Sequence, residues 1–304
     1  MMNFYYLETI YQPSEWMTMF LELGLHLEKK YGAKIHHQKG GYLHIDEFNY
    51  DLPDCVILIH DDETDKLIGV SFEDSPEQSV DVFIRRNKPG DILVLGQFFN
   101  RFPKDFDKSV YNFTIKDGTW YPGIAHTNYE YYYLQRQLYV GHYYETLIDQ
   151  MFFLGNERGD IPGLRDHGLC NLKPGNLHHI EYMNMAIKYK VGFSVGNVGE
   201  ICYRDFEYMA VGIPMLRLEY RTQVTPPLIP NHHYIAVDRS QFPWDQRYDR
   251  EGGTSYIEAY KKRFLEVKDD KEFLLAIAKN GRDYYEKYCC PSTRLNHLLS
   301  IIEL

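Results

Sequence analysis

The sequence predicts an α/β protein made of two Rossmann-like domains that face each other across a cleft. Three observations support this class. The chain has 304 residues, enough for two domains of ordinary size. Strand-like and helical segments alternate through the second half, as in a parallel sheet with helices on both faces. The first half carries short β-like runs with few helices between them, which is typical of a smaller α/β layer with some antiparallel pairing.

The first domain, residues 1–125, begins with a predicted helix in PSEWMTMFLELGLHLEKKYG (13–32). Ser14 is a suitable N-cap, apolar residues recur on one face, and Gly32 ends the segment. β-like runs follow at 42–45, 55–59, 67–72, 80–84 and 91–98. The segment 100–148 has no clear period apart from its tyrosines. It is predicted to hold a last strand, YNFTI, and then the connection between the domains, 126–148.

The second domain, residues 149–304, alternates more regularly. QMFFLGNERGDIPG (150–163) indicates a strand and a glycine loop, and GNLHHIEYMNMAIKYK (175–190) indicates a helix with Ile180, Met183 and Ile187 on one face. Further strands are predicted at 191–195, 215–218 and 234–237, and further helices at 201–211, 254–267, 270–287 and 292–303. The last helix is a candidate to pack back on the first domain.

Composition excludes several classes of function. Hydrophobic residues make up 44% of the chain and charged residues 25%, which is typical of a globular protein. The 33 basic and 43 acidic residues give a formal net charge of −10, so we expect no nucleic-acid partner. No apolar run approaches the roughly 20 residues that span a bilayer, and the first residues do not resemble a signal peptide. The five cysteines are scattered without a CxxC pair, so we expect a reducing, cytoplasmic setting.

Tyrosine occurs 27 times and is concentrated in NYEYYYLQRQLYVGHYYE (128–145). Aromatic rings with hydroxyl tips suit stacking on sugars, and they also suit packing at a seam between domains. Packing is the favoured interpretation.

The segment VGFSVGNVGEICYRDFEYMAVGIPMLRLEY (191–220) carries the strongest functional signal. A glycine loop with Gly196 and Gly199 follows a predicted strand, and in α/β sheets ligands bind at such carboxyl ends. The helix after the loop directs its partly positive amino end to the same place. Arg204 suits phosphate oxygens, and Glu207, on the same helical face, suits a ribose diol. The alternative is an ion pair on a solvated helix face.

GEICYRDFEYMAVGIPML (199–216) resembles the donor-binding segment of GT-B-type glycosyltransferases, most closely the exostosin-like and CAP10-like groups, and LIPNHHYIAVD (228–238) is similar to a strand of the latter. The resemblance implies the GT-B fold, with the donor sugar nucleotide bound by the second domain and the acceptor by the first. It implies that Glu207 holds the donor ribose and that Arg204, helped by Arg158, contacts the diphosphate. The full set expected to bind the nucleotide sugar is Gly155, Arg158, Gly196, Gly199, Tyr203, Arg204, Glu207 and His233.

The sequence also departs from that family. Many retaining members have two glutamates with seven residues between them, whereas Glu200 and Glu207 have six, so the role of Glu200 and the stereochemical outcome stay open. The small size and the tyrosine content are similar to those of glycosyltransferases of large algal viruses that build capsid glycans. One of those is a xylosyltransferase, which makes xylosyl transfer from UDP-xylose a candidate reaction.

Acidic residues and histidines in the first domain offer further candidates. IHDDETDK (59–66) suits a divalent cation, but Asp-rich turns between β-like runs are common, and a turn is favoured. Glu73 and Asp74 follow a strand, and Asp74 is the candidate base that takes a proton from the acceptor hydroxyl, although a polar turn before Pro76 is the simpler interpretation. His60 is a second candidate base. In the pairs His36-His37, His178-His179 and His232-His233, neighbouring side chains point apart, so no metal site is expected.

The sequence therefore predicts a glycosyltransferase that moves a sugar from a nucleotide diphosphate sugar to a hydroxyl acceptor on a glycan or glycoprotein, without a metal or other cofactor. Two alternatives stay open. One is a nucleotide-sugar epimerase of the same architecture, and the other is a binding module without catalytic activity that recognises glycans or proteins.

Overall fold

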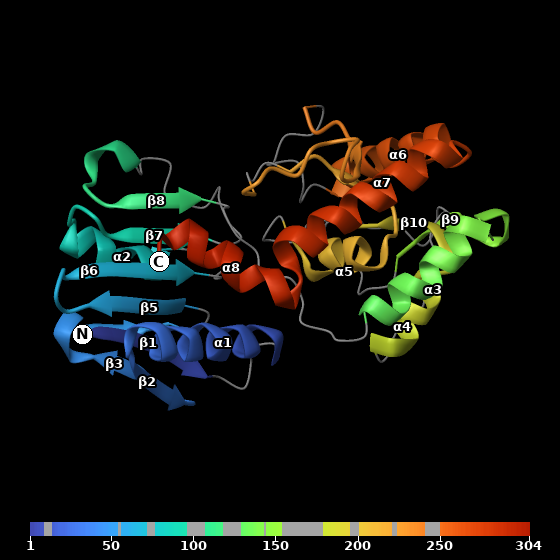
Figure 1. Ribbon diagram of the computed structural model, residues 1–304. Helices are drawn as coiled ribbons and strands as arrows, with labels where there is room; N and C mark the ends of the chain where they lie inside the picture. Colours follow the sequence, from blue (N-terminus) through green and yellow to red (C-terminus); the bar gives the residue numbers. More distant parts are fainter. Residues whose placement is uncertain are drawn as a thin grey trace.

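The computed structural model describes residues 1–8, 14–53, 56–71, 77–95, 107–117, 129–142, 144–153, 179–194, 201–220, 224–240 and 250–304. Within these residues the protein is α/β. Its strands form a six-stranded sheet in the first half of the chain, a four-stranded sheet in the second half and a two-stranded hairpin (Figure 1). None of the described helices is both long and apolar enough to cross a membrane.

The six-stranded sheet is mixed, in the order β2-β1-β5-β6-β7-β8. The strands are β1 (Met2–Glu8), β2 (Lys34–Lys39), β5 (Val56–Asp61), β6 (Lys66–Ser71), β7 (Ile92–Leu95) and β8 (Thr114–Asp117). β5 runs antiparallel to both its neighbours, and the other pairs are parallel. In Figure 1 the arrows of β6 and β8 point toward the second half of the molecule, and that of β5 points away from it. The carboxyl ends of β6 and β8 therefore face the second half.

Helices cover both faces of this sheet. The helices α1 (Ser14–Tyr31) and α8 (Pro291–Ile302) share one face, where Phe20 and Leu23 of α1 and Leu298 of α8 lie in one core. Arg294 of α8 donates to Glu22 of α1 at 2.9 Å. The other face holds α2 (Glu77–Arg86), a 3-10 turn η1 (Asp46–Phe48), and the hairpin of β3 (Leu43–Ile45) and β4 (Tyr50–Leu52). The end of the chain thus completes the core of the first half.

The strand predicted at 80–84 is wrong, because this segment forms α2. A five-residue segment with four apolar residues around Asp81 fits both a strand and one face of a short helix, and Val80 and Phe83, three residues apart, are both buried. The ring of Phe83 packs on β6 above Gly69, where a Cβ atom would lie 2.7 Å from the ring. The strands β1, β2 and β4 (Tyr50–Leu52) were not predicted, whereas β3, β5, β6 and β7 agree with predicted strands and β8 overlaps the end of the predicted strand YNFTI.

The four-stranded sheet is parallel throughout, in the order β12-β11-β10-β9. The strands are β9 (Ile148–Phe152), β10 (Tyr189–Phe193), β11 (Met215–Leu218) and β12 (Ile235–Val237). The helices α3 (Tyr129–His142), α4 (His179–Ala186) and α5 (Tyr203–Val211) cover one face, and α6 (Arg250–Val267) with the start of α7 (Lys271–Tyr284) covers the other. A single π turn (Tyr285–Cys289) leads to α8. The alternation predicted for this half is confirmed.

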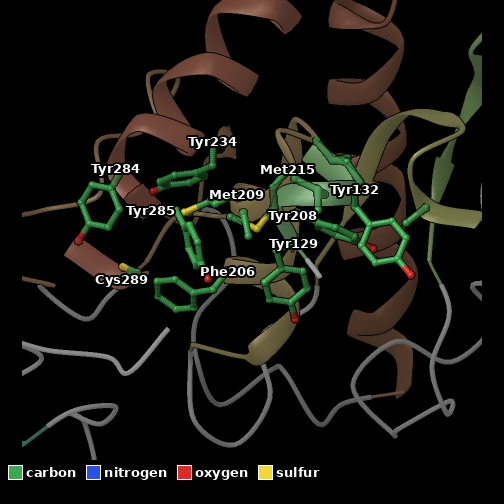
Figure 2. Packing of buried hydrophobic residues seen from close by; sticks show 14 of the residues in the cluster. Tyr129, Tyr132, Phe206, Tyr208, Met209, Met215, Tyr234, Tyr284, Tyr285 and Cys289 are labelled. Atoms are coloured by element: carbon green, nitrogen blue, oxygen red, sulfur yellow. The ribbon is translucent and has the colours of Figure 1, made fainter. Parts of the chain in front are cut away.

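Two details of this half differ from the sequence analysis. Ile180, expected on the buried face of α4, is 43% exposed, and Tyr182 is buried in its place. The segment 128–145, expected to be part of a connection, contains the helix α3. Its residues Tyr129 and Tyr132 are buried in the same core as Phe206 and Tyr208 of α5 (Figure 2). For these tyrosines, packing is therefore the correct interpretation.

Candidate functional site

The amino end of α5 lies at the carboxyl end of β10. Cys202 has extended backbone angles and is the N-cap residue, and the carboxylate of Asp205 accepts a hydrogen bond from the Cys202 N–H at 3.2 Å. The Cys202 side chain in turn accepts from the backbone N–H of Asp205. Together the two contacts satisfy backbone donors that have no partner within the helix. Gly212, in the left-handed region at φ 72°, ends the helix. The first turn of α5 is therefore fixed in place by its own sequence.

A buried polar network then ties this turn to the sheet. Asp205 is 0% exposed and accepts hydrogen bonds from the Ser194 hydroxyl, the Arg217 guanidinium and, at 2.9 Å, the Tyr220 hydroxyl. Ser194 follows β10, and Arg217 belongs to β11. The guanidinium of Arg217 also lies over the Tyr220 ring, 3.4 Å from its centroid. Three consecutive elements, β10, α5 and β11, thus converge on one carboxylate.

Burial sets the protonation of the groups around Asp205. Desolvation raises the pKa of the Tyr220 hydroxyl well above 10, so it is a neutral donor. Desolvation, and then the charge of Asp205, raise the pKa of the Cys202 thiol to about 11, so this cysteine is not a nucleophile at neutral pH. Desolvation works against the Arg217 charge, but Asp205, Tyr220, Cys202 and Tyr234 together outweigh it, and the pKa of Arg217 is raised. The network is built to hold α5, not to react.

Arg204 and Glu207 project from the first turns of α5 into a partly buried environment. The guanidinium of Arg204 lies over the ring of Phe153, 4.4 Å from its centroid, and Phe153 directly follows β9. Glu207 Oε1 lies 3.7 Å from Nδ1 of His179, the first residue of α4, and the Glu207 side chain is only 14% exposed. The solvated helix face that the alternative assumed is therefore not found at Glu207. The two side chains sit among the ends of β9, α4 and α5.

The pKa of Arg204 shows how polar this environment is. Desolvation disfavours its charge, but Tyr182, Tyr208, Cys202 and Glu207 outweigh that effect and raise the pKa. Desolvation also raises the pKa of Tyr182, and Glu207 adds to this. At neutral pH the guanidinium of Arg204 is therefore charged. It lies beside the carboxylate of Glu207 and the neutral hydroxyls of Tyr182 and Tyr208.

Tyr203, the first residue of α5, marks the junction between the two halves of the molecule. It packs against the core of the second half and also against the core that contains α1 and α8. The amino end of α5 therefore faces the first half.

Close packing beneath α5 depends on Gly192 in β10. A Cβ atom at this position would lie 2.6 Å from the ring of Tyr208. The Tyr208 hydroxyl donates to the carbonyl oxygen of Phe152 at 3.2 Å, which anchors the helix to β9 as well. Sequence analysis emphasised the loop glycines, but in the described part of the chain Gly192 is the one that brings α5 onto the sheet.

Several predicted site residues lie outside the described residues: Glu73, Asp74, Gly155, Arg158, Gly196, Gly199 and Glu200. Their strands are described, since β6 ends at Ser71, β9 at Phe152 and β10 at Phe193. The structure thus brings Arg204, Glu207 and Tyr203 together on α5 and leaves the loop residues undescribed.

The two predicted histidines lie elsewhere. His233 precedes β12, at the amino end of that strand, where its Nδ1 accepts from the Ile229 N–H at 2.8 Å and its ring contacts Tyr284. Desolvation, and then His232, lower its pKa to about 4. His60 lies near the end of β5, paired with Asn3 and Leu67 in the register of the sheet. This edge is opposite to the carboxyl ends of β6 and β8, so His60 is not placed to serve as a base beside α5.

The buried network around Asp205 was missed by the sequence analysis. The Cys-x-x-Asp spacing of residues 202–205 is a weak form of the capping-box pattern and could have indicated Asp205. An arginine inside the apolar strand 215–218 was the second available signal, because a buried charge needs a partner.

Comparison with known proteins gives no family for this chain. No protein-family model matches it, and no curated protein sequence matches it at a significant level. Its function therefore has to be argued from the site.

Proposed function

We propose that this protein is a glycosyltransferase of the GT-B type, in which the second half binds a nucleotide diphosphate sugar at the amino end of α5 and the first half binds a hydroxyl acceptor. The proposal rests on one observation. Arg204 and Glu207 are held side by side on the first turns of a helix that follows a parallel strand, and Tyr203 of the same turn reaches the first half.

Each part of that turn suits one part of the donor. The guanidinium of Arg204 offers a fork of donors to diphosphate oxygens, and its stacking on Phe153 holds it at the carboxyl end of β9. Glu207 offers an acceptor for a ribose diol. The amino end of α5 adds a partial positive charge toward the leaving diphosphate. Rate enhancement would then come from positioning and from neutralising charge on the leaving group.

The acceptor side of the proposal rests on the direction in which strand β6 runs. β6 ends at Ser71 with its carboxyl end toward the second half (Figure 1), and Glu73 and Asp74 follow it in the sequence. Asp74 remains the proposed base that takes the proton of the acceptor hydroxyl.

Calorimetric titration with UDP and with GDP in the presence of EDTA tests donor binding directly. Glu207→Gln keeps the size of the side chain and removes its charge. Loss of a hydrogen bond to a charged group costs roughly 1.5–3 kcal/mol, so affinity should fall about ten- to a hundredfold. Glu181→Gln is the matched control, because Glu181 is an exposed carboxylate on the neighbouring helix α4. Urea unfolding of each variant separates a loss of affinity from a loss of fold.

The outcomes separate the candidate functions. Binding of neither nucleotide, or equal affinity of Glu207→Gln and the unaltered protein, would contradict the proposal. If a sugar nucleotide is converted to an isomer without any acceptor, the protein is an epimerase of the same architecture. If nucleotides bind and no donor is consumed with any acceptor, the site binds without transferring.

A further inference from the structure

A second cluster of polar side chains lies at the opposite edge of the six-stranded sheet. His60 is the second-last residue of β5, Asp62 directly follows that strand, and Glu47 lies in the 3-10 turn η1. His60 Nδ1 is 3.1 Å from Glu47 Oε1 and 3.3 Å from Asp62 Oδ1. One ligand atom from each of the three residues lies within 4.8 Å of the others. An imidazole nitrogen and two carboxylate oxygens therefore surround one point.

The histidine ring is buried and held in one orientation. His60 is 2% exposed, and Phe48 packs edge-on against its ring at 5.1 Å. Its Nε2 lies 3.0 Å from Oδ1 of Asp65, whose carboxylate also pairs with Arg86 and Lys88. Because a carboxylate paired with cations can only accept, Nε2 donates a hydrogen bond to Asp65, and Nδ1 is the ring nitrogen that faces Glu47 and Asp62.

That nitrogen is buried without a hydrogen bond of acceptable geometry, although both carboxylates are close. A buried ring nitrogen that lacks a hydrogen bond beside two carboxylate oxygens is accounted for when a cation lies among the three atoms. A histidine that donates its far N–H to a carboxylate while its near nitrogen is free is the arrangement usual for metal ligands.

The separations also suit a metal ion. Ligand bonds of about 2.0–2.2 Å in a tetrahedral arrangement place neighbouring ligand atoms roughly 3.3–3.6 Å apart, close to the 3.1 and 3.3 Å between His60 Nδ1 and the two carboxylate oxygens. The carboxylate of Asp62 is oriented by the Asn3 side chain, which donates to its Oδ1 at 2.7 Å. A set of one imidazole and two carboxylates favours a transition metal over Mg²⁺ or Ca²⁺, which prefer oxygen ligands alone.

We propose that Glu47, His60 and Asp62 bind one divalent transition-metal ion, with zinc as the representative, and that water completes its coordination. The ion would join η1 to the end of β5 and so fix the hairpin of β3 and β4 on the sheet. Because this edge is opposite to the carboxyl ends of β6 and β8, the ion takes no part in the proposed sugar transfer. The proposed metal site can therefore be tested independently of the proposed sugar transfer.

Calorimetric titration of the full chain with ZnCl₂ after treatment with EDTA tests the site, with MgCl₂ and CaCl₂ in parallel. We expect one zinc ion per chain, bound at least tenfold more tightly than Mg²⁺ or Ca²⁺. Glu47→Gln and Asp62→Asn should each weaken zinc binding at least tenfold. Both positions are exposed, so the variants should stay folded, as far-ultraviolet circular dichroism would show.

Asp51→Asn is the matched control. Asp51 is an exposed carboxylate on β4 that pairs with His44 at 2.7 Å, so it represents an incidental histidine–carboxylate pair nearby. Its replacement should leave zinc affinity unchanged. Zinc should also raise the melting temperature of the unaltered protein and of Asp51→Asn, but not of the other two variants. No zinc binding, or equal zinc affinity in Glu47→Gln, Asp62→Asn and the unaltered protein, would overturn the proposal, and so would a loss found with Asp51→Asn alone.

Discussion

Replacing Asp205 with Asn should destabilise the second half of the molecule by about 3–5 kcal/mol, the usual effect of removing one partner from a buried ion pair. The side chains of Asp205 and Arg217 are 0% and 2% exposed. The guanidinium of Arg217 therefore cannot turn to water when its counter-charge is removed. The amide of Asn keeps one acceptor oxygen, whereas Asp205 accepts hydrogen bonds through both of its carboxylate oxygens.

The contacts of Asp205 account for both ends of this range of destabilisation. An uncompensated buried charge alone accounts for about 3 kcal/mol. Each further hydrogen bond that loses its acceptor, such as those from the Tyr220 hydroxyl and the Cys202 N–H, adds about 1 kcal/mol. Relaxation of the helix start would recover part of this sum, so we expect a total between 3 and 5 kcal/mol.

Urea unfolding followed by circular dichroism measures this loss. Asp269→Asn is the control, because Asp269 is a carboxylate of the second half whose side chain is 75% exposed, and its replacement should change stability by no more than about 0.5 kcal/mol. Adding Arg217→Met to Asp205→Asn should recover most of the loss, since the unpaired charge is then gone. A loss below about 1 kcal/mol for Asp205→Asn, with an unchanged slope against urea, would refute the reasoning.

Two further predictions concern packing and pH. Gly192→Ala should lower the stability measured by thermal denaturation by about 1–3 kcal/mol, because its Cβ would lie 2.6 Å from the Tyr208 ring. Adding Tyr208→Leu should recover part of this loss. An unaltered melting temperature for Gly192→Ala would contradict the packing. Desolvation, and then His232, lower the pKa of His233 from 6.5 to about 4, so the unfolded chain binds a proton that the folded chain does not take up between these pH values. Stability in urea should therefore fall more steeply from pH 6.5 to 4 in the unaltered protein than in His233→Asn, and equal slopes would show that His233 titrates normally.

Local patterns were sufficient to predict the second half of the fold and insufficient for parts of the first. The strand at 215–218 and the helix at 201–211 have periods that their own residues define, and Gly212 marks the end of the helix. The run 80–84 is too short to define a period of its own. The burial of Phe83 in α2 involves a contact with Gly69 of β6, which lies fourteen positions away on a different element and is not visible in the local pattern.

The same distinction applies to the site. Arg204 and Glu207 could be paired from their spacing alone, because residues three apart share a helical face. The partnership of Asp205 with Arg217 could not, since it requires the parallel pairing of β10 and β11 to bring the two residues together. The acidic segment at the end of β5 contains one contact that local spacing predicts and one that only the fold creates. Asp61 forms the expected turn by accepting from Thr64 and the Glu63 N–H, whereas Asp62 faces His60 and Asn3.

The buried ion pair also bears on function, because stability alone does not account for it. A buried pair contributes little or nothing relative to well-packed apolar residues of the same volume. What the pair of Asp205 and Arg217 adds is direction, since it fixes the first turn of α5 against β10 and β11 and so sets where Arg204 and Glu207 point. The double variant Asp205→Asn/Arg217→Met should therefore be folded and close in stability to the unaltered protein, but it should bind UDP or GDP more weakly. If the same double variant keeps full nucleotide affinity, the network serves the fold alone, and the start of α5 is not the donor site.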